Sequence, residues 1–396
     1  MSRTPGLFAQ FRDKAAAAQD KAGEWSMPLA GNPTYRLLHV SDLHIGDLPV
    51  TRVPMALNAP TSRWLRNFPV LEGQLGHHAR ALEGLHEFHE DLVKDNIPFD
   101  LVVSGDLTAN GAVAQFGLAD AYLGAGPTPF GYFLDRPDWV ELSVTGNHDN
   151  WPGINSIIGP RTTGPSTYLP GPWPKEVVRQ LTGGRWIRYI LLDTDAEVAA
   201  VGHNRLMGRG AFTQQLIQLE NLPRIEQGEI RVIVMHHSIL GPETAGPHPL
   251  APAPFRHAPV PNGRIRRLEI DHPSARLIRQ FIVDHSISVV LTGHMHEPQL
   301  SLLATTNGRH IGRFLEARCG TTTQRDRYPY KDARNMRAIR TLPPNTLIMH
   351  EIVEENGQHL WTAQLYWLDR QGRFVTQVPH IPGVPQGYAW SSISLP

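Results

Sequence analysis

The sequence predicts a layered α/β fold, and three observations predict it. Short apolar runs of strand length recur along the chain, segments with helical spacing lie between them, and a cluster of polar residues follows each run. Strands that alternate with helices along a chain are typical of layered α/β folds. Ligands collect at the carboxyl ends of the strands in such folds, so we expect a functional site where the polar clusters meet.

Six apolar runs are expected to form buried strands, because each is short, apolar and ended by turn-forming residues. In chain order they are YRLLHV (35–40), FDLVV (99–103), WVELSV (139–144), WIRYILL (186–192), IRVIVM (230–235) and ISVVL (287–291).

Three segments have apolar residues at helical spacing, and we expect helices over 75–95, 211–222 and 273–285. Beyond residue 300 the pattern alternates and turns at Asn356-Gly357, which predicts closing β-hairpins over 300–378. The sequence thus divides into an Ala-rich N-terminal arm (1–34), one domain (35–378) and a loose, Pro/Gly-rich C-terminal tail (379–396).

Composition excludes several function classes. Lys and Arg total 37, as do Asp and Glu, so no net charge recruits nucleic acid or an anionic membrane. The single cysteine, Cys319, excludes an internal disulfide and favours a reducing compartment. The N-terminus has no apolar core of a secretory signal, and no stretch approaches the ~18 apolar residues of a membrane span. We therefore expect a soluble, cytoplasmic protein, with nucleic acid as a possible but not favoured partner.

Oxygen and imidazole donors follow five of the predicted strands, an arrangement that suits a metal site without thiolates. Seven donors are more than one ion could use while keeping a position open for substrate. Two ions that share a carboxylate, at a separation of about 3.5 to 4 Å, would use all of them. In chain order the donors are Asp42, His44, Asp106, Asn147, His236, His294 and His296.

The order of these residues resembles the five-motif signature of the calcineurin-like metallophosphoesterases. The motifs are D-x-H (Asp42, His44), G-D (Gly105, Asp106), G-N-H-D (Gly146 to Asp149), H (His236) and G-H-x-H (Gly293 to His296), within residues 36–300. GDLTANG (105–111) and MHHS (235–238) most resemble the branch that contains bacterial cyclic-nucleotide and glycerophosphodiester phosphodiesterases.

The resemblance implies an αββα sandwich of two mixed β-sheets flanked by helices, with two divalent ions (Mn, Fe or Zn) at the carboxyl ends of strands. One ion would be held by Asp42, His44 and His296, the other by Asn147, His236 and His294, and Asp106 would bridge them.

The resemblance also implies a reaction, the hydrolysis of a phosphodiester by a metal-bridging hydroxide. His148 would act as general acid, with Asp149 holding its ring, and Asn147, His148 and His237 would contact the substrate. We expect His236 rather than its neighbour His237 to be the metal ligand.

Several functional alternatives stay open at this point. Within the family they are a phosphomonoesterase and a nuclease or nucleotide pyrophosphatase, while a scaffold that keeps the fold without turnover is the alternative outside enzymology. The segments 49–66 and 241–272 are longer than connections need, and we expect them to select the substrate. The sequence leaves the oligomeric state open.

Overall fold

A computed structural model describes residues 33–46, 76–96, 98–150, 163–198, 208–239, 270–294, 296, 298–324, 344–355, 357–377 and 390–395. Within these residues the strands form two six-stranded sheets. The arm at 1–34, apart from its last two residues, and segment 49–66 lie outside the described part, as does segment 241–272 before residue 270.

The first sheet has the order β11-β10-β9-β1-β2, with β12 paired to β10. Strands β1 and β2 are parallel, whereas β9, β10, β11 and β12 are joined by antiparallel pairing, so the sheet is mixed. Its strands are β1 (Tyr35–Val40), β2 (Asp100–Val103), β9 (Thr346–Glu355), β10 (Gln358–Leu368), β11 (Phe374–Val375) and β12 (Trp390–Ser394).

The second sheet has the order β3-β4-β5-β6-β8-β7 and is also mixed. Strands β4, β5, β6 and β8 run parallel, and β3 and β7 pair antiparallel at the two edges. Its strands are β3 (Lys175–Gln180), β4 (Trp186–Leu191), β5 (Glu229–Val234), β6 (Val289–Thr292), β7 (Gln299–Thr306) and β8 (Ile311–Arg318).

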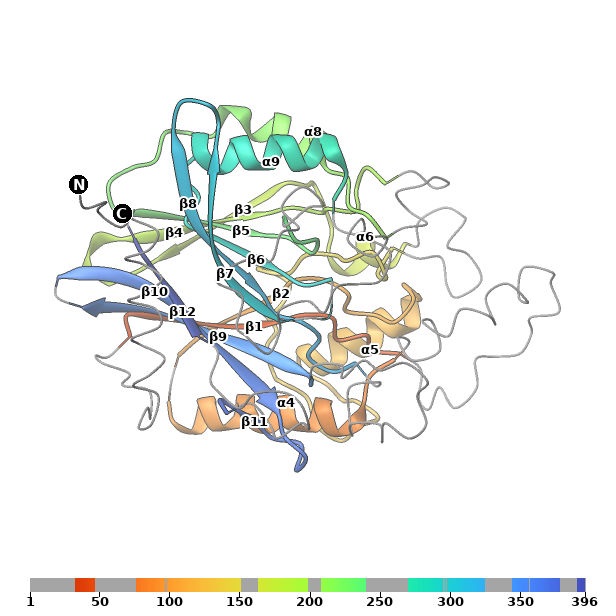
Figure 1. Ribbon diagram of the computed structural model, residues 1–396. Helices are drawn as coiled ribbons and strands as arrows, with labels where there is room; N and C mark the ends of the chain where they lie inside the picture. The colour runs from red at the N-terminus through yellow and green to blue at the C-terminus, as the bar shows by residue number, and fades with distance from the viewer. Residues whose placement is uncertain are drawn as a thin grey trace, which may run out of the picture.

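Helices cover the outer faces of both sheets (Figure 1). On the first sheet lie α4 (Ala79–Lys94) and α5 (Val113–Leu123), and on the second α8 (Thr213–Gln218) and α9 (His272–Asp284). The short helices are α6 (Gly164–Tyr168), η1 (Thr182–Gly184) and η2 (Leu219–Asn221). Helix α9 begins where the Asp271 carboxylate accepts a hydrogen bond from the amide of Ser274, 2.9 Å away, which caps the helix.

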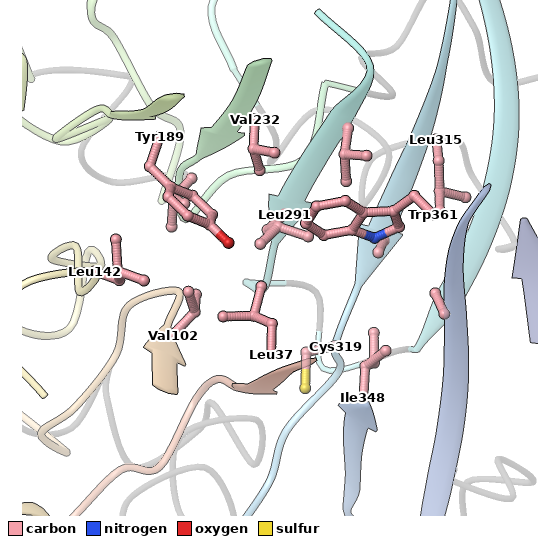
Figure 2. Close-up of a cluster of buried hydrophobic side chains, with 14 of the residues drawn as sticks. Leu37, Val102, Leu142, Tyr189, Val232, Leu291, Leu315, Cys319, Ile348 and Trp361 are labelled. Atoms are coloured by element: carbon pink, nitrogen blue, oxygen red, sulfur yellow. The ribbon is translucent and has the colours of Figure 1, made fainter. Parts of the chain in front are cut away.

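Alternation along the strands builds three apolar layers. In β1, Leu37 packs between the two sheets and Leu38 packs under α4 and α5, because successive side chains of a strand point to opposite faces. Figure 2 shows the central layer, where Leu37 and Val102 of the first sheet face Val232 and Leu291 of the second. The predicted αββα sandwich of two mixed sheets is therefore confirmed.

Some predicted elements differ from the structure. Segment 139–144 forms turns and only one bridge, between Ser104 and Val144, because Trp139 packs inward and its indole donates to Asp120 Oδ1 at 3.1 Å. The sequence reasoning missed α5, whose apolar residues surround the helix, and β3, whose edge position leaves alternate side chains exposed.

Part of the predicted loose tail is ordered, since β12 pairs with residues 360–364 of β10. The remaining tail residues, 379–389 and 396, lie outside the described part. None of the helices in the described residues has the length and apolar character that crossing a membrane requires.

Candidate metal centre

Five of the seven predicted donors lie on tight turns directly after β1, β2 and β6. Asp42, His44, Asp106, His294 and His296 all have φ between 48° and 72°. Side chains other than glycine rarely adopt this left-handed region, and such strain is concentrated at functional sites. Of eight non-glycine residues with positive φ in the described chain, five belong to this one site. The strained backbone of these turns therefore points to a functional site.

A first group of four donors meets at the end of β1. Asp42, His44, Asp106 and His296 each offer one ligand atom, and these atoms all lie within 4.8 Å of one another. His296 Nε2 lies 3.0 Å from Asp42 Oδ1 and 3.1 Å from His44 Nε2. His44, Asp42 and Asp106 are completely buried.

The bonding of two carboxylate oxygens in this group shows whether the site is suited to a cation. Asp42 Oδ1 and Asp106 Oδ2 are buried and accept no hydrogen bond. The other oxygen of each carboxylate is fixed, since Ser41 Oγ donates to Asp42 Oδ2 at 2.5 Å and the amide of His148 donates to Asp106 Oδ1 at 2.8 Å. A buried anionic oxygen that accepts no hydrogen bond is costly, whereas a metal ion would satisfy both oxygens. The donor set thus fits a divalent cation that accepts oxygen and imidazole ligands.

A second group of donors also approaches Asp106. Asn147 Oδ1 is 3.2 Å from His236 Nε2 and 3.0 Å from His294 Nδ1, and His236 Nε2 is 3.3 Å from Asp106 Oδ2. His236 Nδ1 pairs with the carbonyl oxygen of Ser104 at 2.8 Å, which turns Nε2 toward the group. Asp106 is therefore the residue common to both groups.

Charges in the centre shift several pKa values. Burial alone would lower the pKa of His236, but the carboxylates of Asp106 and Asp42 raise it to about 10. Burial would raise the pKa of Asp106, yet His236 and His148 hold it well below its usual range. For His44, burial and the neighbouring His148 lower the pKa. Asp106 therefore stays ionised beside its imidazole neighbours.

His148 lies at the edge of the two groups. Its side chain is nearly buried, and Nε2 is 4.0 Å from Asp106 Oδ2. Nδ1 pairs with the carbonyl oxygen of Ala109 at 2.9 Å, which orients the ring so that Nε2 faces the centre. Burial lowers the pKa of His148, and Asp106 and the Ala109 carbonyl act against that shift.

Asp149 makes different contacts from the one expected. Instead of receiving Nδ1 of His148, its carboxylate accepts the amides of Leu107, Thr108 and Gly146 and the hydroxyl of Thr108, at 2.8 to 3.1 Å. These bonds tie the turn after β2 to the turn that carries Asn147 and His148. Burial and the charge of Asp106 raise the pKa of Asp149 to about 7.

His237 lies beside the second group, but its ring nitrogens are bonded to other residues. Its Nδ1 pairs with Thr194 Oγ1 at 2.7 Å and its Nε2 with the carbonyl oxygen of Gly208 at 2.9 Å, and the side chain is buried. Its ring packs against that of His294, with centroids 4.2 Å apart. Both nitrogens are engaged by the scaffold, so His236 is the better placed of the pair to bind a metal.

Glycine is required at two positions for close packing. A Cβ on Gly146 would lie 2.1 Å from Asp106 Oδ1, and one on Gly105, where φ is 97°, would lie 2.5 Å from His236 Nδ1.

Sequence reasoning missed the supporting groups Ser41, Ser104 and the carbonyl of Ala109. No motif marks them, because they act through the backbone or through small side chains.

A comparison with protein families matches residues 35–298 to the calcineurin-like phosphoesterase family. The chain therefore belongs to the calcineurin-like phosphoesterases. Curated proteins give no match. The family and the four-residue cluster together support a metal-dependent phosphoesterase.

Proposed function

We propose that the chain is a dinuclear metal-dependent phosphodiesterase that hydrolyses a small-molecule diester of the cyclic-nucleotide or glycerophosphodiester type. The observation that carries the proposal is the pair of buried oxygens, Asp42 Oδ1 and Asp106 Oδ2, which accept no hydrogen bond and face imidazole nitrogens. Family membership supplies the reaction class, hydrolysis of a phosphoester. The motifs GDLTANG (105–111) and MHHS (235–238) favour the diester branch.

Each donor has a proposed place. Asp42, His44 and His296 would hold one divalent ion, Asn147, His236 and His294 the other, and Asp106 would touch both. When bound, such a pair of ions activates water near neutral pH and neutralises charge on the phosphoryl group.

His148 would supply the proton for the leaving group. The Ala109 carbonyl fixes Nδ1, so the imidazolium would donate from Nε2, the atom that faces the centre. A bound diester carries negative charge, which favours the protonated imidazole against the effect of burial. Asp149 would act indirectly, because its carboxylate positions the turn that bears His148.

The substrate itself would be chosen outside this core. We propose that Asn147 and His148 contact its phosphate, while the segments 49–66 and 241–272 contact the rest. His237 becomes a positioning residue in this proposal, since both of its nitrogens are bonded to the scaffold. A cytoplasmic location stays a prediction from the sequence.

Comparison of three substrates tests the proposal. With Mn²⁺ added, bis(p-nitrophenyl) phosphate should be hydrolysed faster than p-nitrophenyl phosphate, and linear DNA should be left intact. A preference for the monoester or degradation of DNA would favour the corresponding family alternative. Metal binding without hydrolysis of any of the three would favour a scaffold.

A further inference from the structure

A chain of hydrogen-bonded polar side chains runs along the inner face of the first sheet, within the apolar layer between the two sheets. It consists of Trp361, His350, His39 and Ser104, all completely buried. Trp361 Nε1 is 3.0 Å from His350 Nδ1, His350 Nε2 is 3.4 Å from His39 Nδ1, and His39 Nε2 is 2.8 Å from Ser104 Oγ. Figure 2 shows Trp361 among apolar side chains of the central layer.

Strand register explains how these residues meet. Trp361 pairs with Ile352, two residues from His350. His350 in turn pairs with Leu37, two residues from His39, and His39 pairs with Val102, two residues from Ser104. Each step thus moves one strand across the sheet and two residues along it, on a single face. The chain runs from β10 through β9 and β1 to the turn after β2, where the metal centre lies.

The chemistry of the indole sets the direction of the whole chain. An indole N–H can only donate, so His350 Nδ1 accepts and, in the neutral ring, Nε2 carries the proton. That proton is donated to His39 Nδ1, so His39 also carries its proton on Nε2 and donates to Ser104 Oγ. The indole N–H at one end of the chain thus fixes the tautomers of two buried histidines.

Ser104 connects the chain to the second donor group. Its carbonyl oxygen is the partner of His236 Nδ1 at 2.8 Å, and a Cβ on the adjacent Gly105 would already lie 2.5 Å from that nitrogen. The backbone at 104–105 is therefore packed directly against the His236 ring. A shift of Ser104 would move the imidazole that is proposed to bind the second ion.

A favourable free energy of folding does not require such a chain. Replacing both partners of a buried hydrogen bond by apolar groups of the same shape is often neutral or stabilising, whereas a fully bonded polar network gives rigidity. Groups that orient the imidazole ligands of a metal also set its affinity.

We propose that Trp361, His350 and His39 are positioning residues, which hold Ser104 and thereby set the orientation of His236 and the affinity of the second metal ion. The inference rests on the proposed dinuclear site and adds to it a set of positioning residues that extends across the first sheet.

Nitrogen NMR of the protein labelled with ¹⁵N-histidine tests the chain without any turnover. His39 and His350 should both be neutral Nε2–H tautomers at neutral pH, and Trp361→Phe should release the tautomer of His350. An Nδ1–H tautomer at either histidine in the wild-type protein would overturn the proposal.

Titration of Mn²⁺ by calorimetry tests the positioning role. Ser104→Ala should weaken one of two binding events by about tenfold, the size usual for groups that orient a metal ligand, whereas Ser301→Ala should stay within about twofold of wild type. Ser301 is the matched control, a buried and hydrogen-bonded serine on β7. Equal affinities in both variants would overturn the positioning role.

These readouts separate the two proposals. If the wild-type protein binds two Mn²⁺ ions but hydrolyses no phosphoester, the proposed activity fails, while the tautomers and the Mn²⁺ affinities still decide the positioning role. If it is active and Ser104→Ala keeps the affinity of Ser301→Ala, only the positioning role fails.

Discussion

Replacing Asp106 by asparagine removes the one charge that both donor groups share. Its Oδ2 is 3.3 Å from His236 Nε2 in one group and 3.9 Å from His44 Nε2 in the other. Two unit charges about 4 Å apart interact by about 4 kcal/mol at an effective dielectric constant near 20, or roughly a thousandfold in Kd, and a divalent ion interacts more strongly still. Asp106→Asn should therefore weaken both metal ions together.

Equilibrium dialysis against Mn²⁺, with metal counted per chain, provides the assay. Asp193→Asn is the matched control, because Asp193 is a buried carboxylate at the end of β4 that belongs to neither group. We expect the control to bind two ions and Asp106→Asn to bind neither at micromolar Mn²⁺. Two ions bound with unchanged affinity, or the loss of one ion only, would refute the assignment of a shared carboxylate.

Three further predictions follow from the site and the core. His148→Ala should keep its metal content but slow alkyl phosphodiesters more than nitrophenyl esters, since good leaving groups need no proton; equal losses would contradict a general-acid role. His237→Ala should lose less Mn²⁺ than His236→Ala, and the reverse order in dialysis would exchange their roles. Burial would raise the pKa of Glu229, but bonds from two arginines and a backbone amide lower it to about 2. The ionised Glu229 thus contributes fully to the free energy of unfolding above its ordinary pKa, and this contribution is lost as pH falls toward 2. Urea unfolding should show that the stability advantage of wild type over Glu229→Gln shrinks in that window, by up to about 3 kcal/mol. An advantage independent of pH would rule this out.

The sequence indicated the candidate donors, because all of them except Asn147 follow an apolar run that forms a strand. Asp42, Asp106 and His236 meet at the ends of these strands, although they come from two different sheets. The sequence did not predict which strands pair with each other in the first sheet, because β9 to β12 join that sheet through contacts that are distant in sequence.

Supporting groups were harder to predict. Asp149 was expected to hold the ring of His148, yet backbone amides take both of its oxygens, and no side-chain pattern encodes that choice. His39, His350 and Trp361 alternate along their strands just as apolar core residues do. Periodicity reports which face a side chain occupies and says nothing of the hydrogen bonds it makes there.

Anomalous diffraction from crystals grown with Mn²⁺ would show directly whether two ions bind around Asp106. Two peaks should lie about 3.5 to 4 Å apart, one among Asp42, His44 and His296 and the other among Asn147, His236 and His294, with Asp106 between them. A single peak, or peaks away from Asp106 in protein that hydrolyses diesters, would contradict the proposed dinuclear site.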